Sequence, residues 1–162
     1  MHTEAMNLWP EPAQPLDAPE LLALQRLCFQ SESDLLGGLP IPPLMQSLES
    51  LQTDLQQQTV LVLRSGDQLI GSVRAHQQNH TCHVGRLMVH PSHQGKGLGQ
   101  LLMQHIEEKF AGVQRYELFT AKVSVGNIRL YQKLGYQIFL ERETPQAVCL
   151  VYLEKHNKKH NP

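Results

Sequence analysis

The fold of this chain is decided by residues 85–110, which read GRLMVHPSHQGKGLGQLLMQHIEEKF in a sequence of 162 residues. The apolar run 84–90 is short and rich in valine, which predicts a strand that ends at Pro91. From Leu98 onward the apolar residues recur at positions 98, 101, 102 and 106, the spacing of one face of a helix. The stretch therefore predicts a strand, a loop and a helix.

Three glycines, Gly95, Gly97 and Gly99, lie between this strand and this helix. Glycine lets the backbone approach a ligand closely, because it has no Cβ. A helix N-terminus carries unpaired N–H groups and partial positive charge, which together bind phosphate. The pattern predicts a phosphate or pyrophosphate site. The simpler alternative is a loop that needs glycine for positive φ alone.

Two nucleotide-binding loops are excluded by spacing. In a Walker loop, Ser or Thr follows the lysine, whereas Gly97 follows Lys96. The dinucleotide fingerprint is G-x-G-x-x-G, whereas the glycines here are spaced G-x-G-x-G.

The loop resembles motif A of the GNAT-type N-acetyltransferase superfamily, [Q/R]-x-x-G-x-[G/A]. Gln94, Gly97 and Gly99 fill its fixed positions. The resemblance implies that the loop binds the pyrophosphate of acetyl-CoA through Gln94, Gly95, Lys96, Gly97, Leu98, Gly99 and Gln100. It also implies that the pantetheine arm pairs with the main chain of Leu87, Met88 and Val89, as an added strand does.

Residues 124–136, SVGNIRLYQKLGY, resemble motif B of the same superfamily, N-x-x-[AS]-x-x-L-Y-x-x-x-G-[FY]. The sequence departs from the motif at two positions, because Ser124 occupies the asparagine position and Asn127 the small-residue position. The resemblance implies that both contact the cofactor and that Tyr131 protonates the leaving thiolate. A phenol with a pKa of about 10 suits that role. The alternative for Tyr131 is a ring that packs beside the sheet.

Two residues are candidates for the general base. His83 stands eleven residues before Gln94, where the histone-acetylating branch of the superfamily has its glutamate base, and imidazole titrates near neutral pH. Glu117, on the predicted fifth strand, is the second candidate. Two alternatives stay open: His83 is a half-exposed strand residue, or water relays the proton without a single base.

Outside these motifs, hydrophobic periodicity and turn residues predict the remaining elements. Asp17 is predicted to cap a first helix whose apolar stripe is Leu21, Leu24, Leu27 and Cys28, and a second helix carries Leu44, Leu48, Leu51 and Leu55. The central helix is predicted to end at Gly112. Residues 127–134 are predicted to form a short last helix and residues 155–162 a frayed tail. The predicted strands are 5–9, 60–64, 68–76, 81–90, 115–121, 137–141 and 147–154.

This order resembles the GNAT fold across the whole chain. The resemblance implies an α/β (α+β) fold with a central mixed, mostly antiparallel sheet of six to seven strands. About four helices flank the sheet, and strands 4 and 5 splay apart in a V. The length fits a single domain over residues 1–162.

The composition limits the classes of binding partner and the cellular compartment that we expect. Charged residues make up 18% and the net charge is −1, which argues against nucleic-acid binding. The nine histidines are scattered without the close pairs of metal ligands, so no metal is expected. Three widely spaced cysteines favour a reducing, cytoplasmic location. We expect no signal peptide and no membrane association, because no apolar run approaches the ~20 residues of a membrane helix.

These inferences predict an acetyl-CoA-dependent N-acetyltransferase. A primary amine of a small molecule or peptide would attack the thioester directly in a ternary complex, since Cys82 and Cys149 form no nucleophilic set. The alternative is a non-catalytic acyl-CoA-binding sensor on the same fold. The acceptor, the acyl chain preference and the choice between monomer and homodimer stay open. Glu32 and Asp34 either attract a cationic amine or are simply solvated.

Overall fold

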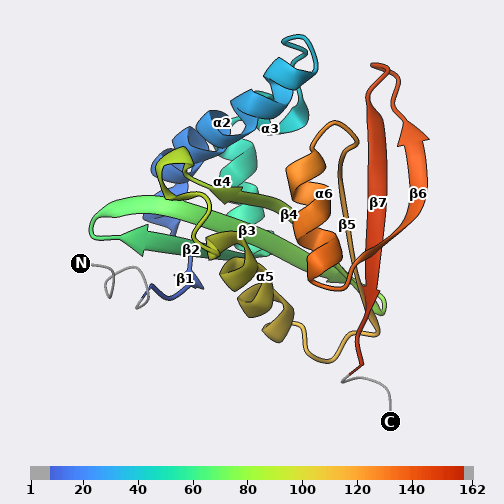
Figure 1. Ribbon diagram of the computed structural model, residues 1–162. Coiled ribbons are helices and arrows are strands. Elements are labelled where there is room, and N and C mark those ends of the chain that lie inside the picture. The colour runs from blue at the N-terminus through green and yellow to red at the C-terminus, as the bar shows by residue number, and fades with distance from the viewer. Residues whose placement is uncertain (1–7, 159–162) are drawn as a thin grey trace.

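The computed structural model describes residues 8–158, which form a seven-stranded sheet in the order β1-β2-β3-β4-β5-β7-β6 (Figure 1). The strands are β1 (Glu11–Pro12), β2 (Thr59–Ser65), β3 (Gln68–Gln78), β4 (Thr81–Val89), β5 (Arg115–Ala121), β6 (Gln137–Glu143) and β7 (Cys149–His156). Neighbouring strands are antiparallel except β4 and β5, which are parallel. The predicted mixed, mostly antiparallel sheet is confirmed.

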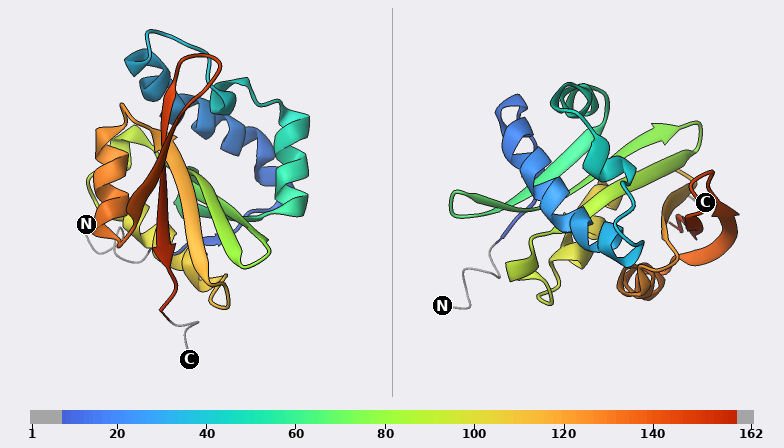
Figure 2. Two further views of the ribbon diagram at one scale, coloured as in Figure 1. Left: turned by 90° about the vertical axis from the view of Figure 1, so that its right-hand side faces the viewer. Right: turned by 90° about the horizontal axis from the view of Figure 1, so that it is seen from above.

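Helices cover both faces of the sheet (Figure 2). The helices are α2 (Ala18–Leu35), α3 (Pro42–Met45), α4 (Leu48–Gln57), α5 (Leu98–Glu108) and α6 (Val125–Lys133), with short 3-10 turns η1 (Pro15–Asp17) and η2 (Pro91–His93). Helix α5 packs Leu102, Met103 and Ile106 into the larger core cluster, and α6 adds Tyr131. On the opposite face, Leu21 of α2 and Leu51 of α4 pack over β2 and the end of β4.

The V-shaped splay between β4 and β5 is confirmed. The two strands pair over three residues each, Thr81–His83 with Arg115–Glu117, and then separate. Two residues of β4, Arg86 and Leu87, oppose one residue of β3, and Arg86 adopts a φ of 52°. Such a bulge bends a strand and increases its twist. In Figure 1, β4 and β5 leave one corner of the sheet in different directions.

The N-terminal predictions need three corrections. The first strand is Glu11–Pro12; of the predicted strand 5–9, residues 5–7 lie outside the described residues and residues 8–9 form no strand. Asp17 occupies the N-cap position of α2, but its carboxylate does not cap the helix, because it accepts the Gln14 amide at 2.7 Å and pairs with Arg64. Leu27, predicted in the apolar stripe, is 48% exposed.

Several element boundaries also differ from prediction, among them that of the last helix, α6, which begins at Val125 and not at residue 127. The helix expected to begin near Leu44 is divided into α3 and α4, because Ser47 Oγ accepts the Ser50 amide at 3.1 Å and starts a new helix. Helix α5 ends at Glu108, before Gly112. The predicted tail is wrong for its first residues, since β7 continues to His156 and Asn157 Nδ2 donates to the main chain of Ala111; residues 159–162 lie outside the described residues.

A buried ion pair fixes α4 to β3 and gives a stability prediction. The Arg74 side chain is 3% exposed and its Nη1 donates to Asp54 Oδ2 at 2.8 Å. Burial lowers the pKa of Arg74 to about 10, so the guanidinium stays charged at neutral pH. Asp54→Ala leaves this charge unpaired and is expected to lower the free energy of unfolding by about 3 kcal/mol.

Urea unfolding of Asp54→Ala beside Asp67→Ala tests this expectation. Asp67 lies in the exposed turn between β2 and β3, where such changes usually cost less than about 0.5 kcal/mol. Equal losses of the free energy of unfolding in both variants would show that Asp54 contributes no more to stability than an exposed carboxylate does.

Candidate functional site

The glycine loop leads from the end of β4 into the first turn of α5. Gly97 is the N-cap residue of α5 and has a φ of 80°, and Gly95 has a φ of 79°. Both positions favour glycine because side chains are strained in this region. Gln94 Nε2 donates to the Val89 carbonyl at 3.1 Å and ties the loop to β4. The unpaired amides of the first turn of α5 therefore point to a fixed anion site.

Gly99 serves a different purpose from Gly97. A Cβ built on Gly99 would lie 3.2 Å from Leu130 Cδ2 of α6, whereas one on Gly97 would meet nothing within 4 Å. Gly99 therefore allows α5 and α6 to pack closely, and Gly97 provides the left-handed turn with open space in front of it.

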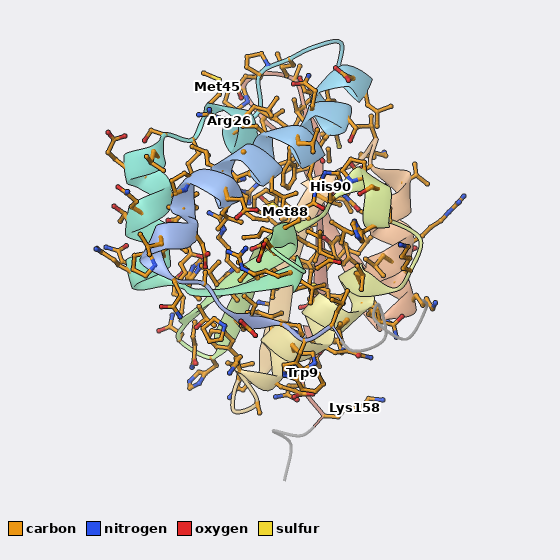
Figure 3. All side chains as sticks on the ribbon, turned by 90° about the vertical axis from the view of Figure 1, so that its left-hand side faces the viewer. Trp9, Arg26, Met45, Met88, His90 and Lys158 are labelled. Atoms are coloured by element: carbon orange, nitrogen blue, oxygen red, sulfur yellow. The ribbon has the colours of Figure 1, made fainter. Side chains whose placement is uncertain are left out.

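A cavity of about 770 Å³ runs from this loop along the splayed part of β4 to α2 and the start of α6. Figure 3 shows Met88 beneath α2, at the end of β4 near His90. The predicted cofactor residues that line the cavity are Leu87, Met88, Val89, Gln94, Gly95, Gly97, Leu98, Gly99, Gln100, Ser124 and Asn127. Lys96 and Tyr131 are not among the lining residues.

Helix α2 forms a wall of the cavity in which Glu32 is the only residue that was considered for the site from the sequence. This wall consists of Cys28, Phe29, Ser31, Glu32 and Leu35. Positions 28, 31, 32 and 35 share one face of a helix, but their mixed polarity resembles a solvated face in the sequence. Their proximity to a loop more than 60 residues away comes from the tertiary fold.

Glu32 and Ser124 join the two sides of the cavity. Ser124 Oγ donates to Glu32 Oε1 at 2.8 Å, so α2 is linked to the residue that precedes α6. Glu32 is the one carboxylate among the described residues that line the cavity. The serine in the asparagine position of motif B is therefore engaged by a protein side chain.

Tyr131 lies just below the cavity surface. Its side chain is 7% exposed, its ring centroid lies 6.1 Å from that of Tyr136, and its neighbour Leu130 lines the cavity. Burial and then the charge of Glu32 raise the pKa of Tyr131 well above its ordinary value. The phenol therefore keeps its proton at neutral pH and can act as a donor.

The two base candidates meet at the corner of the V. His83 and Glu117 are the last paired residues of β4 and β5, with His83 Nδ1 3.9 Å from Glu117 Oε2. The His76 ring stacks on His83 at 5.2 Å, and Arg115 Nη1 donates to Glu117 Oε1 at 2.9 Å. Burial lowers the pKa of His83, although Glu117 opposes this effect. Neither candidate lines the cavity.

The splayed sheet, with a glycine loop at a helix N-terminus beside the splay, defines an acetyltransferase-type α/β fold. Residues 19–136 match the model of the acetyltransferase (GNAT) family. The chain belongs to this family, and the resemblance inferred from the two motifs is confirmed.

Known proteins similar to this chain include a sequence relative and several solved structures. The UPF0157 protein YqkA of Bacillus subtilis is 28% identical over 120 residues, 74% of this chain and 34% of the relative, so the chain spans about a third of that protein. Similar structures include the ribosomal-protein-S18-alanine N-acetyltransferase of Escherichia coli, at 14% identity and a TM-score of 0.75, over 93% and 94% of the two chains.

Two further similar structures were solved with the cofactor. The PaiA N-acetyltransferase of Thermoplasma acidophilum, in complex with coenzyme A, is 19% identical with a TM-score of 0.73, over 93% and 99% of the two chains. The putative acetyltransferase YncA of Salmonella typhimurium, with acetyl-CoA, is 16% identical with a TM-score of 0.75, over 96% and 97%. At these identities the likeness shows the fold.

Two kinds of feature are absent from residues 8–158. No helix in this range is both long and apolar enough to cross a bilayer. No three side chains of His, Cys, Asp or Glu in the same range gather as metal ligands.

Proposed function

We propose that this protein transfers the acetyl group of acetyl-CoA to the primary amine of a small molecule or peptide. The observation that carries the proposal is the single cavity that joins the glycine loop to the part of β4 that has no β5 partner. Pyrophosphate would bind the amides at the start of α5. Pantetheine amides would pair with the main chain of Leu87–Val89, which places the thioester in the V.

Direct attack by the amine in a ternary complex is supported by the state of the cysteines. Cys28 is the cysteine that lines the cavity, its thiol donates to the Val89 carbonyl, and burial raises its pKa to about 11. A protonated thiol is a poor nucleophile. We therefore propose that no acyl-enzyme forms and that Tyr131 protonates the departing thiolate. All three cysteines are free, which agrees with the predicted cytoplasmic location.

A screen of amines, amino acids, antibiotics and peptide N-termini for release of free thiol from acetyl-CoA tests the proposal. Acetyl-CoA at 100 times its Kd is expected to stabilise the fold by about 2.7 kcal/mol, seen as a rise in Tm. No rise in Tm would contradict the cofactor assignment.

The second candidate is a sensor that binds acyl-CoA without catalysis. The observation in its favour is that Tyr131 does not line the cavity. A protein that is stabilised by acetyl-CoA but acetylates no amine in the screen would support this candidate.

The pH dependence of kcat/KM tests His83 as the base. A histidine base must be neutral, so activity falls as the pH drops through its pKa. Because burial lowers the pKa of His83, this fall is expected below the ordinary value of about 6.5. His83→Ala is expected to remove the limb and most activity at pH 7. Glu117→Ala is measured beside it, and unchanged profiles in both variants would favour a water relay.

A further inference from the structure

Glu32 is a carboxylate in a cavity that we assign to a polyanionic cofactor. An acidic side chain at a phosphate site repels the ligand, so the cofactor does not account for it. Glu32 lies on α2 and contacts Ser124 at the start of α6, whereas the proposed anion site lies at the start of α5. The cavity therefore has a phosphate-binding part and an acidic part.

The hydrogen bonds of Glu32 leave one oxygen available. Oε1 accepts the Ser124 hydroxyl at 2.8 Å, which orients the carboxylate. Oε2 has no hydrogen-bond or ion-pair partner among residues 8–158. Arg86 is near enough for the charge of Glu32 to affect its pKa, yet the two form no ion pair. The half-buried carboxylate is thus held in place and is not neutralised by direct contact.

The position of Glu32 relative to Tyr131 indicates which part of the reaction it faces. Of the carboxylates, Glu32 is the one whose charge acts on the Tyr131 phenol. The phenol is the proposed proton donor to the thiolate, and Glu32 contacts Ser124, the residue before the helix that carries Tyr131, inside the cavity that we assign to the cofactor. His83 and Glu117 lie at the corner of the V and outside the cavity.

We propose that Glu32 binds the ammonium group of the acceptor, so that the acceptor is an amine that arrives as a cation. The inference rests on the proposed acetyl transfer and assigns its substrate class. Oε2 accepts a charge-assisted hydrogen bond from the ammonium, while Ser124 holds Oε1. An amine without a positive charge can still donate a hydrogen bond to Oε2, but it lacks the Coulombic attraction between the ammonium and the carboxylate.

Two coenzyme A thioethers test the inference without knowledge of the natural acceptor. S-(2-aminoethyl)-CoA carries an ammonium close to the position that the amine attacks, and S-propyl-CoA is its uncharged counterpart. Titration calorimetry of the intact chain is expected to show that the wild-type protein binds the aminoethyl compound about 10- to 100-fold more tightly, the range for a hydrogen bond to a charged group.

The variants separate Glu32 from its neighbours. Glu32→Gln is expected to remove the preference and leave the affinity for S-propyl-CoA unchanged or higher. Asp34→Asn makes the same change on an exposed residue of α2 outside the cavity and should retain the preference. Glu32→Asp keeps the negative charge and should retain part of the preference for the aminoethyl compound. Thermal unfolding shows whether each variant is folded.

Each outcome decides the inference. A preference in the wild-type protein that Glu32→Gln removes and Asp34→Asn retains supports it. Equal affinities in the wild-type protein, or an unchanged preference in Glu32→Gln, overturn it and leave the proposed function standing. Failure of both thioethers to bind the wild-type protein overturns the proposed function and this inference with it.

Discussion

Gly97→Glu is expected to weaken acetyl-CoA binding by about 10²–10⁴-fold, the loss of two hydrogen bonds to charged groups. Gly97 is the N-cap residue of α5, and the space in front of it is open. A glutamate there would place a negative charge where the pyrophosphate is proposed to bind. Titration calorimetry with acetyl-CoA measures the effect.

The matched control for this variant is Gly66→Glu. Gly66 lies in the turn between β2 and β3, has a φ of 60° and also has nothing within 4 Å of its built Cβ. Both variants therefore carry comparable backbone strain, of order 1–3 kcal/mol. We expect similar losses of Tm in both but an unchanged Kd for Gly66→Glu. Wild-type affinity in folded Gly97→Glu would mean that this loop does not hold the cofactor.

The sequence is most informative where the determinants of structure are local. Strand β5 was predicted with its observed bounds, Arg115–Ala121, and α5 with its observed start at Leu98. In both cases the periodicity of side chains and the adjacent glycines or turns act within a few residues. The same reasoning was wrong at Ser47, because the apolar periodicity continues across it while α3 ends at Met45 and the serine hydroxyl caps α4.

The irregular backbone of β4 was less predictable. The positive φ of Arg86 in β4 was not predicted from the sequence. The bulge depends on the pairing of β4 with β3, and pairing with a distant strand is not encoded in the local pattern. The splay was therefore predicted from family resemblance, whereas the bulge in β4 became visible only in the register of its pairing with β3.

The candidate site combines a local part and a non-local part. The glycine loop and the start of α6 are continuous segments, so their motifs were visible in the sequence. The contact between Ser124 and Glu32 joins residues 92 positions apart. The sequence alone does not decide whether Glu32 attracts an amine or is simply solvated. Its placement on the cavity wall depends on the packing of α2 over β4.

Tyr131→Phe is expected to lower kcat by about 10²–10⁴-fold, the range for a general acid, while the Kd of acetyl-CoA stays unchanged. The cofactor affinity should not change because the side chain is 7% exposed and does not line the cavity. Since burial raises the pKa of Tyr131, its ionisation should cause no loss of activity between pH 7 and its ordinary pKa of about 10. Steady-state kinetics with an amine from the screen provides the measurement.

Tyr136→Phe is the control that separates catalysis from packing. The Tyr136 ring lies beside Tyr131, and its hydroxyl donates to Glu107 Oε2 at 2.7 Å. Its loss should cost about 1.5–3 kcal/mol of stability, the range for a hydrogen bond to a charged group, with kcat within about twofold of wild type. Tyr131→Phe should show the reverse pattern, because no hydrogen bond of its hydroxyl is seen within residues 8–158. If folded Tyr131→Phe turns over at the wild-type rate, the phenol is a packing residue and the thiolate takes its proton from water.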